Sequence, residues 1–165
     1  MPDRCAIFID GGYIKKVLMR FGKPRISYLA LSERLRGGKE RLRTYYYDCA
    51  PYVSSPPDPE ELERAESFDR FKRTIEQESR FQVRLGRLQK IWTPGGEKFT
   101  QKMVDILLTC DLLKLALEHQ ISQAVLIAGD NDFVPAIQIA KDAGTVVQLY
   151  YSQDPNPHEE LLAAC

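Results

Sequence analysis

The fold of this chain is decided by the stretch Cys5-Ala6-Ile7-Phe8-Ile9-Asp10-Gly11-Gly12-Tyr13. It starts with an apolar run of strand length, which indicates a strand that is buried on both faces. Asp10 ends the run, and the glycines after it let the backbone turn sharply into a helix that we expect to begin near Tyr13. The stretch therefore predicts a strand, a tight turn and a helix, the unit from which parallel α/β sheets are built.

A second stretch of the same kind lies nearer the end of the chain. The apolar run 124–128 is followed directly by Gly129-Asp130-Asn131-Asp132-Phe133. Carboxyl ends of parallel strands meet at one edge of the sheet, in the crevice where open α/β sheets place their active sites. We therefore expect Asp10, Asp130 and Asp132 to lie there, although the turn could use one of the last two as a helix cap. Carboxylates crowded in this way repel one another unless a divalent cation joins them.

The remaining pattern predicts an α/β fold, a three-layer α/β/α sandwich with a mainly parallel central sheet of about five strands. Strands are expected near residues 4–9, 43–48, 81–91, 124–128 and 145–149. Helices are expected near Tyr13, after the capping residue Ser27, over 60–79 and 102–119, and from Phe133 to Gly144. The apolar stripe of the helix over 60–79 is expected from Leu62, Ala65, Phe68 and Ile75.

The connections are also readable from composition. A Pro-rich loop is expected over 51–59, and segments 87–92 and 98–101 could form a small hairpin around the turn at 93–97. Residues 1–151 form one domain in this interpretation. Residues 152–165 form a C-terminal tail, in which a break in regular structure is expected over 154–157 and a short helix after it.

The composition is that of an ordinary globular protein, with 44% hydrophobic and 28% charged residues. Lys plus Arg and Asp plus Glu each number 23, so the net charge is zero and does not by itself indicate a nucleic-acid partner. No apolar run reaches the length of a membrane span, and the charged start of the chain does not resemble a signal peptide. We therefore expect a cytoplasmic protein with no membrane partner. The cysteines lack Cys-x-x-Cys spacing, which favours buried free thiols over zinc ligands or disulfides.

Two further acids lie in the helix expected over 102–119. Asp111 falls within the apolar stripe of this helix, so its carboxylate must be paired, hydrogen-bonded or near a cation. It is either a satisfied core carboxylate or a metal ligand. Asp105 lies in the first turn, where it is either solvated or points from the helix N-terminus towards the sheet crevice.

Other chemistries are disfavoured by what the sequence lacks. The only histidines are His119 and His158, which argues against a His-dependent triad and against a His-ligated zinc site. There is no Walker A motif, no Gly-x-Ser-x-Gly elbow and no Gly-x-Gly-x-x-Gly after the first strand. What remains is metal-assisted chemistry with an all-oxygen ligand set, which suits Mg²⁺ or Mn²⁺ and phosphate esters.

Short motifs in a specific order closely resemble the NYN domain family, in its LabA-like branch of the PIN-like nucleases. They are Asp10-Gly-Gly-Tyr13, Lys102-x-Val-Asp105, Asp111-Leu-Leu and Gly129-Asp-x-Asp-Phe133. The resemblance implies a PIN-like fold, a Mg²⁺ or Mn²⁺ site and endoribonuclease activity. The family's catalytic and metal-binding acids map onto Asp10, Asp105, Asp130 and Asp132, with Asp111 as a further acidic position. Tyr13 stands where many relatives carry Asn, which bears on substrate and efficiency.

RNA, single-stranded or structured, is the partner that the resemblance implies. Contacts to it are expected from basic and aromatic residues, namely Tyr13, Lys15, Lys16, Arg84, Arg87, Lys90, Lys98 and Lys102. Tyr45, Tyr46, Tyr47 and Trp92 could add stacking, although tyrosines in a strand are usually core residues. The alternative is a catalytically weak RNA-binding or protein-interaction module that keeps the fold, which the neutral charge and Tyr13 favour. A Toprim-like nuclease would also use Asp130 and Asp132, but it would carry Glu at the position of Asp10. A homo-oligomer is a further expectation, without support from particular residues.

Overall fold

The structure, a computed structural model, describes residues 2–154 and 156–165. Its elements in chain order are β1 (Arg4–Asp10), α1 (Gly11–Arg20), α2 (Tyr28–Leu35), β2 (Glu40–Cys49), α3 (Pro59–Gln77), β3 (Phe81–Thr93), β4 (Gly96–Lys102), α4 (Val104–Leu117), β5 (Gln123–Ile127), the short 3-10 helix η1 (Asn131–Phe133), α5 (Val134–Asp142), β6 (Val146–Tyr150) and α6 (Glu159–Ala164).

Within the described residues the sheet has six strands in the order β4-β3-β2-β1-β5-β6. All neighbouring strands pair in parallel except β4, which pairs antiparallel with β3. The predicted mainly parallel α/β fold is confirmed. The strand that was not among the five expected ones is β4, which is the second arm of the expected hairpin. β1 occupies the centre of the sheet because its apolar run can be buried on both faces, and residues 5–9 are 0% exposed.

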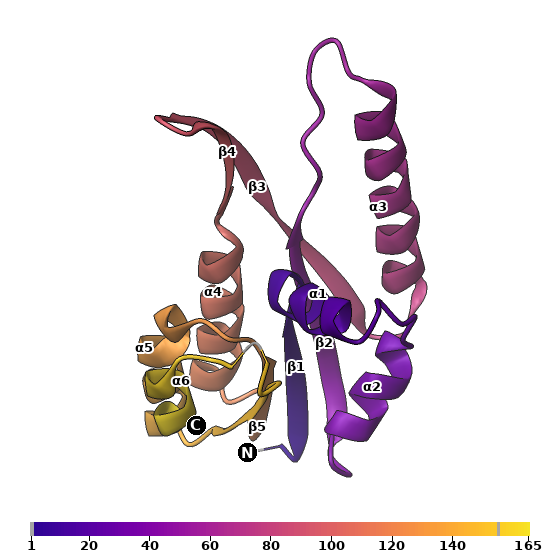
Figure 1. Cartoon of the computed structure of the whole chain (residues 1–165). Helices are drawn as coiled ribbons and strands as arrows, with labels where there is room; N and C mark the ends of the chain where they lie inside the picture. Colours follow the sequence, from indigo (N-terminus) through magenta and orange to yellow (C-terminus); the bar gives the residue numbers. More distant parts are fainter. Residues whose placement is uncertain (1, 155) are drawn as a thin grey trace.

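Helices cover both faces of the sheet, as Figure 1 shows. On one face α1, α2 and α3 pack on a cluster that includes Ile7 and Ile9 of β1. On the other face α4, α5 and α6 pack on a cluster that includes Ala6 and Phe8. Successive β1 side chains thus enter different hydrophobic cores, which explains why the strand reads as a continuous apolar run.

The helix expected over 60–79 is present as α3, but most of its predicted apolar stripe is not in the core. Ile75 is 4% exposed, whereas Leu62 is 45% exposed. In Figure 1 the N-terminal turns of α3 extend past the end of β2, so that part of the helix has no sheet beneath it. The helix begins where it does because Asp58 and Glu61 form a reciprocal capping box and Pro59 occupies the first turn.

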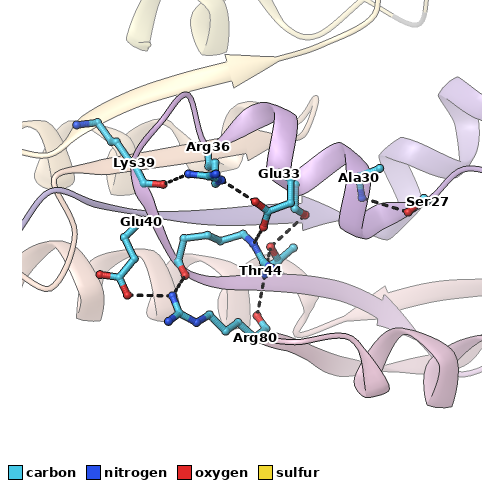
Figure 2. A network of polar contacts seen from close by, with 10 residues as sticks. Ser27, Ala30, Glu33, Arg36, Lys39, Glu40, Thr44 and Arg80 are labelled. Carbon is cyan, nitrogen blue, oxygen red and sulfur yellow. Dashed lines mark hydrogen bonds and ion pairs between the residues drawn. The ribbon is translucent and has the colours of Figure 1, made fainter.

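A network of polar contacts fixes the amino-terminal end of β2 (Figure 2). Its centre is Arg41, which is 6% exposed and donates through Nε to Glu33 of α2 at 3.0 Å. The Arg41 guanidinium also donates to the Thr44 hydroxyl at 3.3 Å and to the Arg80 carbonyl at 3.4 Å. A buried guanidinium must be paired, and these partners tie α2 and the residue before β3 to the sheet. This end lies opposite to the end at which Asp10 emerges.

The last residues of the chain pack on the body of the domain. Leu161 of α6 is 0% exposed and belongs to the same core cluster as α4 and α5. The break expected over 154–157 includes Pro155, which lies outside the described residues. The division of the chain at residue 151 stays a prediction.

The cysteines partly contradict the sequence analysis. All of them lie among the described residues and are free, but only Cys5 and Cys49 are buried, whereas Cys110 and Cys165 are exposed. The expectation of buried thiols is therefore wrong for Cys110, which lies on the solvent side of α4, and for Cys165 at the end of the chain. Among the described helices, none has the length and apolar character needed to cross a membrane.

The turn from β1 into α1 depends on the absence of a side chain at Gly11. A Cβ there would lie 2.6 Å from the Tyr47 carbonyl oxygen and 2.9 Å from the Tyr46 ring and hydroxyl. We expect Gly11→Ala to lower the free energy of unfolding by about 1–3 kcal/mol, because the backbone of β2 must shift. Gly95→Ala is the control, since a Cβ there would lie no closer than 3.8 Å to another group. Urea unfolding of both variants measures the difference, and equal midpoints would contradict the steric argument.

Candidate metal centre

Asp10 ends β1 and caps α1. Its carboxylate Oδ1 accepts a hydrogen bond from the Tyr13 backbone N–H at 3.2 Å. This cap explains why the helix begins at Gly11 rather than near Tyr13. Burial raises the pKa of the Asp10 carboxyl, the N–H groups of Tyr13 and Gly12 partly offset this, and the negative charge of Asp48 raises it further. Asp10 is therefore an oriented carboxylate in an unfavourable electrostatic environment.

Asp130 and Asp132 follow β5 in one tight turn. The Asp130 Oδ1 accepts from the Asp132 backbone N–H at 3.0 Å and so caps η1. The possibility that the turn uses one of the two acids as a cap thus applies to Asp130. Asp132 is exposed and lies in the first turn of η1.

Asp105 in the first turn of α4 completes an acidic group with these residues. Asp105, Asp130 and Asp132 each offer a carboxylate oxygen, and these oxygens all lie within 4.8 Å of one another. Burial, together with the negative charges of Asp10, Asp130 and Asp132, raises the pKa of Asp105 to about 6. Repulsion from the neighbouring carboxylates thus adds to the effect of burial on the titration of Asp105.

A cavity of about 320 Å³ joins Asp10 to this group. Its walls include Asp10, Asp105 and Asp130, together with Gly12, Tyr13, Lys16, Gln101, Gly129, Asn156 and His158. Several carboxylates converge on a small volume that also contains one lysine in its wall. Hard oxygen donors at this spacing suit a divalent cation such as Mg²⁺ or Mn²⁺, whose charge would relieve the repulsion. The residues present therefore fit such an ion.

Asp111 lies apart from the acidic group. The Tyr47 hydroxyl donates to its Oδ2 at 2.9 Å, and the Arg84 guanidinium donates to both of its oxygens at 3.1 and 3.2 Å. These contacts satisfy the carboxylate and match the interpretation of Asp111 as a paired core residue. They also place Arg84 in an ion pair rather than at the acidic cavity.

Sequence reasoning missed Asp48, which lies near the end of β2 and is 2% exposed. It is ion-paired with Lys15, and its charge acts on Asp10 in the next strand. An acid at the end of a predicted strand was the signal that could have found it. Lys15, which was expected to contact RNA, is ion-paired with Asp48 and lies over the Phe68 ring at 5.7 Å, and its contact with RNA stays a prediction.

The other residues expected to contact RNA fall into different places. Tyr13 is 8% exposed, its hydroxyl accepts from the Ser152 N–H at 3.0 Å, and its ring packs on Gly129. Lys16 lines the acidic cavity, and the exposed side chains of Arg87, Lys98 and Lys102 lie on the hairpin of β3 and β4. The expectation of stacking is wrong for Tyr45, Tyr46 and Tyr47, whose rings are in the core, whereas Trp92 is 76% exposed.

The family model identifies the type of domain, and two further comparisons give similar proteins without an assigned function. The family model of the NYN domain matches residues 4–165. The uncharacterized protein y4oD of Sinorhizobium fredii is 45% identical over 49 residues, which are 30% of this chain and 23% of that protein's length. The crystal structure of a protein of unknown function, VPA0982 from Vibrio parahaemolyticus, superimposes with a TM-score of 0.65 at 18% identity, covering 99% of this chain and 90% of that one. This structural likeness shows the fold alone.

The raised pKa of Asp105 makes stability depend on pH when no divalent ion is present. Its folded-state pKa of about 6 exceeds the ordinary value of 3.8, so the folded protein binds more protons than the unfolded chain between these values. The free energy of unfolding should therefore fall as pH rises through this window. We expect Asp105→Asn to flatten the fall and to be more stable than the wild type above about pH 6. Urea unfolding in EDTA from about pH 4 to about pH 8 measures this, and parallel curves for both proteins would contradict it.

Asp111 and the acidic group should respond differently to substitution. We expect Asp111→Ala to lower the free energy of unfolding by about 1–3 kcal/mol, because it leaves the buried Tyr47 hydroxyl and Arg84 without their partner. Binding of Mn²⁺, measured by calorimetry, should be unchanged. Asp69→Ala on the exposed face of α3 is the control for stability. Loss of Mn²⁺ binding in Asp111→Ala, with its fold retained, would make Asp111 a ligand.

Proposed function

This chain belongs to the NYN domain family of PIN-like nucleases, and we propose that it is a Mg²⁺- or Mn²⁺-dependent endoribonuclease that hydrolyses RNA phosphodiester bonds. The observation that carries the proposal is the convergence of Asp10, Asp105, Asp130 and Asp132 at the carboxyl edge of the sheet. Its place in the LabA-like branch, its cytoplasmic location and its assembly as a homo-oligomer stay predictions.

Asp105, Asp130 and Asp132 are the residues that would hold the ion, and Asp10 is the fourth acid of the same site. When bound, a divalent ion lowers the pKa of coordinated water and stabilises the negative charge that develops on the phosphate. The capping hydrogen bonds that Asp10 and Asp130 accept support this role, because each holds its carboxylate in one orientation before an ion or substrate arrives.

The chain's own contribution to substrate binding would come from the cavity wall. Lys16 lines the cavity beside Asp10 and can pair with a phosphate oxygen of the substrate. Outside the cavity wall, Lys102 is the last residue of β4 and is exposed, so it is a second candidate for a phosphate contact. Gln101, Asn156 and His158 line the same cavity and offer polar groups to a bound nucleotide.

The second candidate function is an RNA-binding or protein-interaction module with little catalytic activity. The environment of Tyr13, at the position where many relatives carry Asn, favours it. The Tyr13 ring packs on Gly129, and its hydroxyl accepts a hydrogen bond from the Ser152 N–H. This part of the wall of the acidic cavity therefore lacks the Asn amide that many relatives would place there. In this alternative the acids would bind an ion or a partner without cleavage.

The two functions are separated by a cleavage assay on labelled RNA with Mn²⁺ or with EDTA. We expect Mn²⁺-dependent cleavage by the wild type and a loss of about 10²–10³-fold or more in Asp10→Asn and in Asp130→Asn, because each removes charge from the reacting site. Asn can replace Asp as a helix cap, so both variants should fold. Asp69→Asn makes the same change at a distant exposed position and should cleave like the wild type.

Equal activity in the wild type and in both site variants would sink the catalytic proposal. The same holds for cleavage that persists in EDTA. In either case the RNA-binding alternative would lead, and binding of uncleaved RNA would be its first test.

A further inference from the structure

The hairpin of β3 and β4 has two faces of different chemistry. Side chains alternate between the faces of a strand, and the pairing places Lys90 opposite Phe99, Trp92 opposite Glu97 and Leu88 opposite Gln101. We call the face formed by Leu88, Lys90, Trp92, Glu97, Phe99 and Gln101 the crevice face. The outer face is formed by Arg87, Gln89, Ile91, Lys98, Thr100 and Lys102.

The crevice face is continuous with the acidic cavity. Gln101 lines that cavity together with Asp10, Asp105 and Asp130, and its side-chain amide lies 3.6 Å from the place of a Cβ on Gly12. Figure 1 shows the hairpin projecting from the body of the sheet beyond the start of α4. A polymer held at the carboxylates would therefore meet the crevice face as it leaves the cavity.

Exposed aromatic rings distinguish the crevice face. Trp92 is 76% exposed and Phe99 is 45% exposed. Tyr52, from the loop before α3, lies 5.0 Å from the Phe99 ring, and the Lys90 ammonium lies 5.6 Å from both the Tyr52 and the Trp92 rings. Rings that are held in place but left open to solvent are the stacking platforms on which proteins bind unpaired bases.

We propose that the crevice face guides single-stranded RNA to the acidic cavity, with unpaired bases stacked on Trp92 and Phe99. This inference rests on the proposed function, since it assigns the substrate of that site to the single-stranded class. Bases in a duplex are stacked on one another and cannot present their faces to these rings. Phe99 and Gln101 are alternate residues of β4, and alternate residues of a strand are about 7 Å apart. The Phe99 ring therefore lies one step along the crevice face from the cavity.

Charge alone would select the outer face instead. Arg87, Lys98 and Lys102 give that face three cations and no acid, whereas Lys90 on the crevice face is paired with Glu97 at 2.6 Å. Phosphate contacts by exposed lysines give affinity that falls with salt, while stacking does not. The two faces therefore predict different salt dependence, and the hairpin offers matched variants for both.

The experiment uses the full chain and a labelled single-stranded oligouridine, with EDTA present so that no cleavage occurs. Trp92 is the only tryptophan of the chain, so quenching of intrinsic fluorescence reports directly on stacking at this position. We expect the single strand to quench Trp92 emission and a blunt RNA duplex of equal length to leave it unchanged. Quenching by the duplex to the same extent would overturn the assignment of a single-stranded substrate.

Affinities of variants then compare the faces. We expect Trp92→Ala and Phe99→Ala each to weaken binding about 5- to 100-fold without changing the salt slope. Lys98→Gln on the outer face should leave affinity and salt slope near those of the wild type, whereas a path along the outer face would lower the slope by about 0.7, the share of one phosphate contact. Lys90→Gln makes the same change of charge on the crevice face, so the two lysine variants compare the faces directly. Both aromatic side chains are exposed, so unfolding midpoints near that of the wild type are expected and verify the fold.

Failure of the inference is distinguishable from failure of the proposed function. Absence of quenching at saturating RNA, with wild-type affinity in both aromatic variants, overturns the path along the crevice face even if Mn²⁺-dependent cleavage is present. Quenching with weakened variants supports the path even if no cleavage is found, in which case the chain binds single strands without cutting them.

Discussion

Electrostatic repulsion among carboxylates is the constraint on which the organisation of this domain depends. Parallel strands β1 and β5 are neighbours, so Asp10 and Asp130 emerge at the same edge of the sheet. The start of α4 adds Asp105, and the turn before α5 adds Asp132. Burial raises the pKa values of Asp105 and Asp10, and neighbouring negative charges raise them further: those of Asp10, Asp130 and Asp132 for Asp105, and that of Asp48 for Asp10. A fold selected for stability alone would not gather these groups, whereas a bound divalent ion turns the same repulsion into affinity.

The rest of the structure holds these acids in place. Close packing of Gly11 on the Tyr47 carbonyl fixes the turn after β1 against β2, and the caps on α1 and η1 orient Asp10 and Asp130. At the other end of β2 the Arg41 network anchors the strand to α2 (Figure 2). Asp111 of α4 and Arg84 of β3 pair with each other and stay separate from the acidic group.

The sequence predicted those features that depend on local pattern. Apolar runs located β1 and β5, Ser27 marked the start of α2, and the turn at 93–97 indicated the hairpin. What it could not supply were relations between distant residues. The pairing of Asp48 with Lys15 spans 33 positions, and the burial of Tyr45, Tyr46 and Tyr47 depends on which helices cover β2. Likewise, the outer-face position of Arg87, Lys98 and Lys102 follows from the hairpin register, and His158 reaches the cavity only because the tail crosses the domain.

The most direct test of the central claim is the anomalous scattering of manganese in crystals grown with Mn²⁺. The account predicts an anomalous peak at the carboxyl edge of the sheet, within about 2.0–2.6 Å of carboxylate oxygens of Asp105, Asp130 and Asp132 or of Asp10. A fully occupied peak elsewhere, with these carboxylates protonated among themselves or paired with lysine, would contradict it. In that case the crowding of acids would need a different explanation.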